Sequence, residues 1–176
     1  MYKKYSPRDQ LEQDDYMWEN VSFENSIEVI KRRSITRLFD NYLKKGNTIL
    51  EGGCGNGAWV YFLNKMGYNC IGVDKNKKIL GSNTGTDLML MEGDVEKLDF
   101  NNNYFDAYLS LGVVEHNLKG PFKALAEAFR VIKPGGYLFL STPCNNYFRK
   151  IFNHPLRDLA NIYYKLKGHK LHFVEH

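Results

Sequence analysis

The sequence of 176 residues has no long apolar run and contains few cysteines and prolines. No stretch approaches the ~18 apolar residues that a membrane-spanning helix needs, so we expect no stable membrane insertion. The amino terminus carries charges with no apolar stretch behind them, so we also expect no secretory signal peptide. The three cysteines form no CxxC pair and are odd in number, which is typical of reduced thiols and favours a cytoplasmic protein.

The composition is that of an ordinary globular protein. Hydrophobic residues make up 43% and charged residues 25%, which excludes intrinsic disorder, and the length fits one domain. The net charge is +4, because residues 143–176 carry six basic and two acidic groups while residues 1–142 carry 18 of each. This excess is too small to indicate a nucleic-acid-binding face, so we expect no nucleic-acid partner.

Short apolar segments alternate with helical ones from Asn47 onward. The segments that predict strands are Thr48–Glu51, Cys70–Asp74, Leu88–Met91, Phe105–Ser110 and Tyr137–Thr142. The segments that predict helices are Ala58–Met66, Asn76–Gly81 and Pro121–Lys133, the last with an apolar face of Phe122, Leu125, Ala126, Phe129 and Ile132. Strands that are apolar throughout and are separated by helices predict a doubly wound, Rossmann-like α/β sandwich of three layers with a mainly parallel sheet.

A glycine-rich loop, Glu51-Gly-Gly-Cys-Gly-Asn-Gly57, follows the first predicted strand and opens a helix. In a doubly wound sheet, ligands bind beyond the carboxyl ends of the strands, beside the first strand. Glycines at that place let the backbone turn sharply and approach a ligand. Glycine clusters also form plain turns, so the loop by itself leaves both interpretations open.

Carboxylates at neighbouring strand ends favour a ligand. Asp74 ends the second strand, where it can accept hydrogen bonds from both ribose hydroxyls or cap the helix that follows. Asp94 follows the third strand, where it can accept a hydrogen bond from the exocyclic amine of a base or serve a turn. Glu51 at the loop entrance disfavours phosphate and suits an ammonium or sulfonium cation. Together these residues predict a nucleoside ligand with a cationic group.

The same residues resemble the ordered motifs of class I S-adenosylmethionine-dependent methyltransferases, and above all the broad group that includes the small-molecule and quinone-biosynthesis O-methyltransferases. Across residues 47–143 the motifs are Ile49–Gly57, Gly72–Asp74, Glu92–Val95, Phe105–His116 and Arg130–Gly136. This sequence departs from the family at Glu51, where aspartate is more common, and at Gly52 and Gly53, where a single glycine is usual.

The resemblance implies S-adenosylmethionine as the cofactor, with S-adenosylhomocysteine as the product, and it assigns the residues of the nucleoside end. Asp74 is expected to bind the ribose. Asp94 is expected to take the N6 amine of the adenine, with Val95 packed on the ring.

The resemblance also assigns the methionine end of the cofactor. Glu51 is expected to hold the amino group, Gly53 and Gly55 to line the methionine moiety, and Leu111 to wall the sulfonium. Arg33 is expected to reach the cofactor carboxylate, although a solvated basic helix face explains it equally well.

Catalytic groups are scarce in the motifs. Methyl transfer requires mainly alignment of the acceptor, and His116 is the natural candidate if a base is needed. The alternative is that Glu115 and His116 only fix the loop before the next helix. The carboxy-terminal histidines, His169, His172 and His176, lack suitable partner ligands, so we expect no metal.

We therefore expect an enzyme that transfers a methyl group to an O or N atom of a small-molecule acceptor. One alternative is a non-catalytic cofactor-binding domain or subunit. Another is an NAD-dependent dehydrogenase, which the loop disfavours because its glycines do not follow the GxGxxG spacing.

The flanking segments complete the expected organisation as one domain. Residues 1–46 are expected to form a lid and one helix, beginning with a capping box at Asn25 and Glu28, and residues 144–176 an incomplete cap on the acceptor side of the core. The resemblance implies the strand order 3-2-1-4-5, with the final strands missing. An unpaired fifth strand is an aggregation hazard, so we expect a longer natural chain, pairing by residues 170–174, or a homo-oligomer through this edge.

Overall fold

The structure, a computed structural model, describes residues 22–80, 87–117 and 119–142. The chain divides into two compact units, Met1–Ser141 and Thr142–His176, and the helices and strands described here belong to the first. Residues 1–21 of the expected lid, the expected cap at residues 144–176 and the pairing segment within it at residues 170–174 lie outside the described residues.

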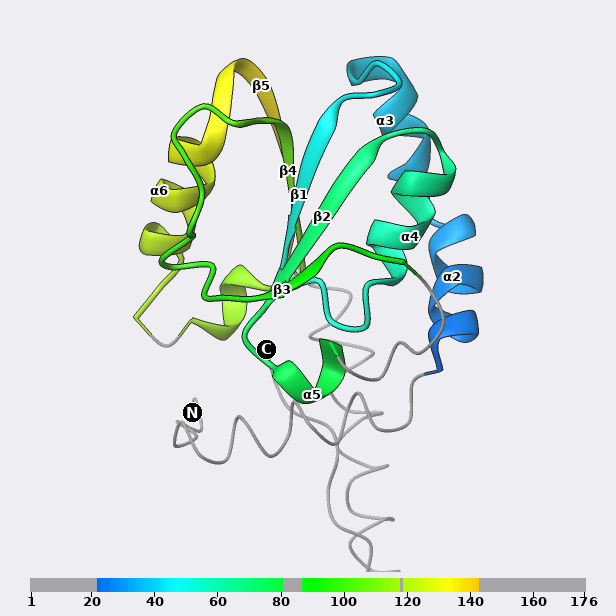
Figure 1. The fold of residues 1–176 in the computed structure, drawn as a ribbon, viewed down its shortest axis with the longest axis horizontal. Coiled ribbons are helices and arrows are strands. Elements are labelled where there is room, and N and C mark those ends of the chain that lie inside the picture. The colour runs from blue at the N-terminus through cyan, green and yellow to red at the C-terminus, as the bar shows by residue number, and fades with distance from the viewer. Residues whose placement is uncertain (1–21, 81–86, 118, 143–176) are drawn as a thin grey trace, which may run out of the picture. The chain divides into compact units, whose positions relative to one another are not determined.

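Five strands form one parallel sheet in the order β3-β2-β1-β4-β5 (Figure 1). The strands are β1 (Thr48–Gly52), β2 (Asn69–Asp74), β3 (Leu90–Glu92), β4 (Phe105–Leu111) and β5 (Ile132–Ser141). The predicted doubly wound fold and its strand order are confirmed. Because β1 is the central strand and lies between β2 and β4, its carboxyl end faces the gap where ligands bind in such sheets.

One face of the sheet packs against three helices, α2 (Phe23–Lys31), α3 (Thr36–Tyr42) and α4 (Ala58–Lys65) (Figure 1). The core on this side joins the buried Phe39 of α3 to Trp59 of α4 and Phe139 of β5, with edge-to-face ring contacts at 5.9 and 5.0 Å. Burial of these large rings supplies much of the favourable energy that holds the helices on the sheet.

The single long helix expected up to Gly46 is wrong, because the structure breaks it into α2 and α3. Residues 32–35 belong to neither helix, and the Thr36 hydroxyl donates to the Arg33 carbonyl at 2.8 Å. The N-cap of α2 is Ser22, whose hydroxyl accepts the backbone N–H of Asn25 at 3.2 Å, so the expected cap at Asn25 is also wrong. The break lets α2 and α3 pack separately, since Ile30 and Phe39 are both buried.

The other face of the sheet packs against α6 (Phe122–Val131) (Figure 1). Its buried side consists of Ala124, Ala128 and Val131, while Phe122 and Phe129 are 78% and 84% exposed. The apolar face predicted from the sequence is therefore not the face that packs on the sheet. Small residues let α6 approach the strands closely, which leaves the two phenylalanines on the outer side.

The fifth strand begins earlier than its sequence indicates, and α6 ends at Val131 instead of Lys133. Ile132 pairs with Phe105 and Tyr137 with Ala107, so the Pro-Gly-Gly segment between them forms a bulge. Opposite the bulge, between Phe105 and Ala107, Asp106 accepts hydrogen bonds from the Lys133 ammonium (2.6 Å) and the Thr48 backbone N–H (2.7 Å). These bonds tie the beginnings of β1, β4 and β5 together at the end of the sheet opposite to the ligand gap.

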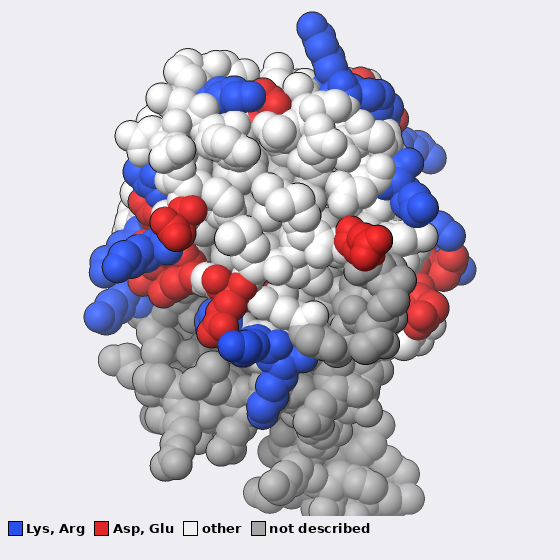
Figure 2. Space-filling model, in the orientation of Figure 1, with Lys and Arg blue, Asp and Glu red and all other residues white. Residues whose placement is uncertain are grey.

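In the described part of the chain, β5 forms one edge of the sheet and β3 the other. Tyr137, Leu138 and Leu140 of β5 are each more than 40% exposed. None of the described helices is long and apolar enough to cross a bilayer. On the face shown in Figure 2, basic and acidic side chains are interspersed among the described residues and no single-sign patch forms.

Gly52 explains why this loop begins with two glycines. A Cβ at Gly52 would collide with the hydroxyl of the buried Tyr108 on β4, with the ring carbon Cζ only 2.6 Å away. We expect Gly52→Ala to lower the free energy of unfolding by ~1–3 kcal/mol through overpacking. Chemical denaturation should show a smaller decrease in the free energy of unfolding when Gly52→Ala is made in a Tyr108→Phe background. Equal losses in the two backgrounds would mean that the tyrosine hydroxyl is not the obstacle.

Candidate cofactor site

The glycine loop is fastened to the end of β2. The backbone N–H groups of Gly53 and Cys54 both donate to the Val73 carbonyl, at 2.7 and 3.1 Å, and Gly55 N–H donates to Asp74 Oδ2 at 2.8 Å. Gly53, Gly55 and Gly57 all have positive φ, a conformation that glycine adopts without strain. The spacing of the glycines therefore follows from the turn that carries the chain from β1 into α4.

Asp74 is held in place by the loop and by the chain that follows it. Its Oδ2 accepts the Gly55 N–H and its Oδ1 accepts the Asn76 N–H, both at 2.8 Å. The helix-capping role considered for Asp74 falls to Asn76, whose side chain accepts the N–H groups of Lys78 and Ile79. Each carboxylate oxygen keeps a second lone pair, so Asp74 is a preoriented acceptor for further hydroxyl donors.

Asp94 lies two residues after β3 and serves the turn expected for it. Its Oδ1 accepts the Glu96 N–H at 2.8 Å, which closes a local turn, and its side chain also borders a cavity. Because a carboxylate has two oxygens, the turn fixes the orientation of Asp94 and leaves acceptor capacity for a ligand.

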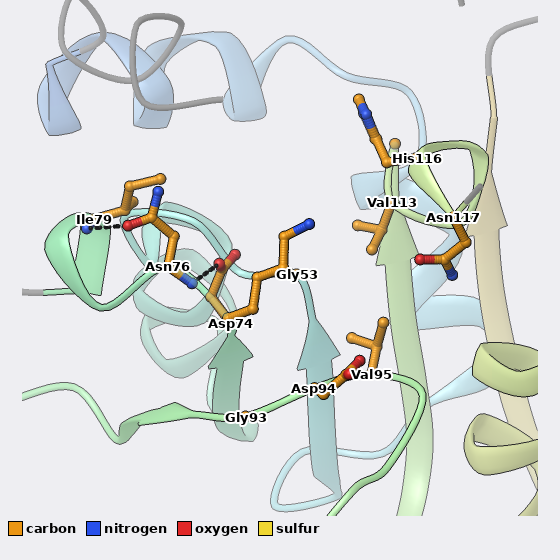
Figure 3. A pocket seen from close by; sticks show the side chains of 12 residues that line it. Gly53, Asp74, Asn76, Ile79, Gly93, Asp94, Val95, Val113, His116 and Asn117 are labelled. Carbon is orange, nitrogen blue, oxygen red and sulfur yellow. Dashed lines mark hydrogen bonds between the residues drawn. The ribbon is translucent and has the colours of Figure 1, made fainter. Parts of the chain in front are cut away.

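A cavity of about 120 Å³ lies beyond the ends of β2, β3 and β4. Figure 3 shows Asp74, Asn76 and Ile79 on its left, Asp94 and Val95 below, and Val113, His116 and Asn117 on its right. Two carboxylates and several apolar side chains thus surround one space, an arrangement suited to a ribose and a planar base.

A second cavity, of about 290 Å³, lies between α2, α4 and the end of β1. Arg33, Glu51 and Leu111 line it, together with the apolar Ile30 and Trp59. The chain therefore brings an arginine and a glutamate, 18 positions apart in the sequence, to one hollow. An arginine and a glutamate are the partners that suit the carboxylate and the ammonium group of a free amino acid.

Glu51 is buried, with an exposed fraction of 3%, and its Oε2 has no hydrogen-bond partner in the described part of the chain. Burial raises the pKa of Glu51 well above its ordinary value, and the negative charge of Asp74 raises it further. The backbone N–H of Val60 opposes this shift in pKa. A cation placed beside Glu51 would supply the missing partner and favour the ionised carboxylate.

The two cavities share part of their walls, at Gly53 and Gly112. Val113 packs against Gly53 at the place where a Cβ would otherwise lie, so any side chain on Gly53 would displace it. The two cavities are therefore neighbours on either side of a common wall of glycine backbone.

The predicted cofactor residues divide between the two cavities. Asp74, Asp94 and Val95 line the first, and Arg33, Glu51 and Leu111 line the second. Gly53 lines both. Gly55 lines neither of them and instead orients Asp74 through its N–H.

His116 lines the first cavity. No group of three or more potential metal ligands occurs among the residues that the structure describes. Sequence reasoning missed Ile79, Val113, Asn117 and Trp59 as lining residues. In the sequence, Ile79, Val113 and Asn117 resemble ordinary apolar or turn residues. Trp59 lies two positions after the glycine loop, and this position indicates that it borders the same site.

Comparisons with known proteins agree with this geometry. The methyltransferase domain family matches residues 50–140. A ubiquinone biosynthesis O-methyltransferase of Aliivibrio fischeri is 29% identical over 104 residues, which are 55% of this chain and 44% of that protein. A demethylmenaquinone methyltransferase of Staphylococcus saprophyticus is 30% identical over 135 residues, which are 70% of this chain and 58% of that protein. The chain thus spans about half the length of the curated relatives it matches.

A solved structure also shares the fold. The S-adenosylmethionine-dependent methyltransferase from Archaeoglobus fulgidus superposes with a TM-score of 0.64 at 22% identity, covering 80% of this chain and 64% of that one. The matched residues contain the glycine loop, Asp74 and Asp94. They also contain all five strands, apart from the first two residues of β1 and the last residue of β5. Because the family match extends over more than half of the sequence, the chain belongs to the methyltransferase domain family.

Proposed function

We propose that this chain binds S-adenosylmethionine across the two joined cavities and transfers its methyl group to an O or N atom of a small-molecule acceptor. The observation that carries the proposal is the shared wall at Gly53 and Gly112. It adjoins a cavity with two aspartates and a cavity with a glutamate and an arginine. The base and ribose of the cofactor can lie in the first, and the amino acid at its other end can lie in the second.

The residues present fit this cofactor. The unpartnered Oε2 of the buried Glu51 suits an ammonium donor. Two backbone N–H groups already fix the orientation of Asp74, so its side chain loses little conformational freedom when ribose hydroxyls bind.

The chemistry that the bound cofactor supplies is a methyl group on an activated sulfonium. The protein's part is to align the acceptor and exclude water. Glu51 and Arg33 orient the amino-acid end, while Asp74 and Asp94 orient the nucleoside end. His116 remains our candidate for a base, at the nucleoside side of the wall. The binding of cofactor without turnover would instead favour the non-catalytic alternative, which the partial coverage of the relatives keeps open.

The names of the relatives support a small acceptor of the quinone-precursor kind, since they are a ubiquinone biosynthesis O-methyltransferase and a demethylmenaquinone methyltransferase. The proposal is tested by incubating the chain with methyl-labelled S-adenosylmethionine and a panel of catechols, naphthols and small amines. Labelled product from any of them supports transfer. An inert panel combined with tight cofactor binding supports a cofactor-binding domain.

We also propose that β5 pairs with a strand of a second copy of the chain. Its exposed Leu138 and Leu140 are uncharged, so two copies can meet without opposing charges. Sedimentation at rising concentration should show a dimer that Leu140→Lys weakens. Met89→Lys, which changes a 62% exposed methionine just before the opposite edge strand, should leave it intact. A monomer at all concentrations would contradict this pairing.

Substitution of the two aspartates should separate their roles. Asp74→Ala should weaken binding of S-adenosylhomocysteine by ~1.5–3 kcal/mol, because a charged acceptor of two hydroxyls is lost. Asp94→Asn should cost less, because its amide oxygen can still accept a hydrogen bond after rotation. Titration calorimetry measures both affinities, and thermal melts check that the loop around Asp74 stays folded. A larger loss in Asp94→Asn would require the two roles to be exchanged or dropped.

The buried Glu51 should give the ligand-free protein a particular pH dependence. Its pKa is raised in the folded state, so the folded protein holds more protons than the unfolded chain, and stability falls as pH rises from about 4.5 toward the raised value. Glu51→Gln removes this loss. The melting temperature of the variant relative to wild type should therefore increase between pH 5 and pH 8.

The control for this measurement is Glu24→Gln, which removes an exposed carboxylate on α2. A difference between Glu51→Gln and wild type that stays constant over the same pH range would show that Glu51 ionises freely in the folded protein.

A further inference from the structure

One face of α2 forms a wall of the second cavity. The residues that line the cavity from this side recur at the three- and four-residue spacing of a single helix face, and they are Asn25, Ser26, Val29, Ile30 and Arg33. Arg33 lies two positions beyond the end of α2, but its backbone N–H donates to the Ile30 carbonyl at 2.9 Å. The place of Arg33 in the cavity wall therefore depends on how α2 is seated.

Apolar contacts hold α2 against the core. Ile30 is buried, and the ring of Phe23 meets the ring of Tyr61 on the neighbouring helix α4 edge-to-face, with 5.5 Å between the ring centres (Figure 1). Such contacts keep the helix on the sheet, but the hydrophobic effect is non-directional. They therefore leave the rotation of α2 about its own axis loosely determined.

Asn56 of the glycine loop adds a directional contact. Its side chain is buried, with an exposed fraction of 5%, and it lines the second cavity. Its Oδ1 accepts the backbone N–H of Ala58, the first residue of α4, at 3.3 Å, and its Nδ2 donates to the Ser26 hydroxyl, also at 3.3 Å. Because the acceptor end of the amide is engaged by α4, the donor end is directed at α2.

The Ser26 hydroxyl connects this amide to the beginning of α2. It donates to the Ser22 carbonyl at 3.1 Å, and its oxygen accepts the bond from Asn56. Hydrogen bonds weaken steeply as they bend, so this pair of bonds restricts the rotation of α2. Ser26 and Arg33 both line the second cavity, so the rotation that places Ser26 also directs Arg33.

We propose that Asn56 is a positioning residue, which through Ser26 seats α2 over the second cavity and so places Arg33 for the carboxylate of a ligand's amino-acid group. This inference rests on the proposed cofactor site. Arg33 belongs to none of the ion pairs among the described residues, so its guanidinium is available for such a carboxylate. Bonds between a guanidinium and a carboxylate need a definite geometry, so a shift of α2 weakens binding at the amino-acid end and spares the nucleoside end.

The test compares two ligands that differ only at the amino-acid end. S-adenosylhomocysteine carries the amino acid, whereas 5′-methylthioadenosine has the same nucleoside and thioether and ends in a methyl group. Titration calorimetry on wild type, Ser26→Ala and Ser26→Thr gives the ratio of the two affinities without any turnover. Ser26→Ala removes the acceptor of the Asn56 amide, and Ser26→Thr keeps a hydroxyl there.

The matched control is Ser34→Ala, because Ser34 is an exposed serine that follows α2 and lines neither cavity. Thermal melts of each variant check that α2 stays folded. The same comparison is repeated in an Arg33→Ala background, which lacks the group that Ser26 is inferred to place.

We expect Ser26→Ala to lower the preference for S-adenosylhomocysteine about fivefold, the order expected for the loss of one hydrogen bond. Its affinity for 5′-methylthioadenosine should stay within about twofold of wild type. Ser26→Thr should restore most of the preference, and Ser34→Ala should keep all of it. In the Arg33→Ala background, Ser26→Ala should change neither affinity by more than about twofold, because the two residues act as a unit.

Equal weakening of both ligands in Ser26→Ala would overturn the proposal, because it would show that the bond only supports the fold. An unchanged ratio, or a full fivefold loss in the Arg33→Ala background, would overturn it as well. If wild type binds neither ligand, or binds both equally, the proposed cofactor site itself fails. If wild type prefers S-adenosylhomocysteine and the ratio is insensitive to position 26, the cofactor site stands and the positioning role of Asn56 does not.

Discussion

The attachment of the glycine loop to the end of β2 is the constraint on which the rest of the site depends. One carbonyl, that of Val73, accepts two N–H groups of the loop, and the neighbouring Asp74 carboxylate accepts a third. These bonds set the path of the chain into α4 and, at the same time, the direction of the carboxylate that we assign to the ribose. A change that loosened the loop would therefore disturb both cavities, because Gly53 forms part of each wall.

The sheet and most of the site could be predicted from the sequence, because both depend on local patterns. Strands covered on both faces must be apolar throughout, and the glycines, Asp74 and Asp94 follow strand ends at fixed positions. Parallel pairing then brings all carboxyl ends to one edge, so residues distant in the sequence meet without further information. Glu51 and Asp74 came together in this way, since Gly52 pairs with Val73.

The remaining features depend on packing, which the pattern of residue types does not contain. Phe122 and Phe129 recur at helical spacing, yet α6 turns its alanines to the sheet because the available distance suits small side chains. The break between α2 and α3 likewise follows from the burial of both Ile30 and Phe39.

The burial of Glu51 also links ligand capture to proton release. A carboxyl group whose pKa is raised by burial keeps its proton in the empty site over a range of pH in which an exposed glutamate is ionised. When an ammonium group takes its place beside the carboxyl, the charged form becomes the favoured one and the proton leaves for the solvent. The apparent affinity for such a ligand then rises with pH, and the heat of binding contains the ionisation enthalpy of whichever buffer receives the proton.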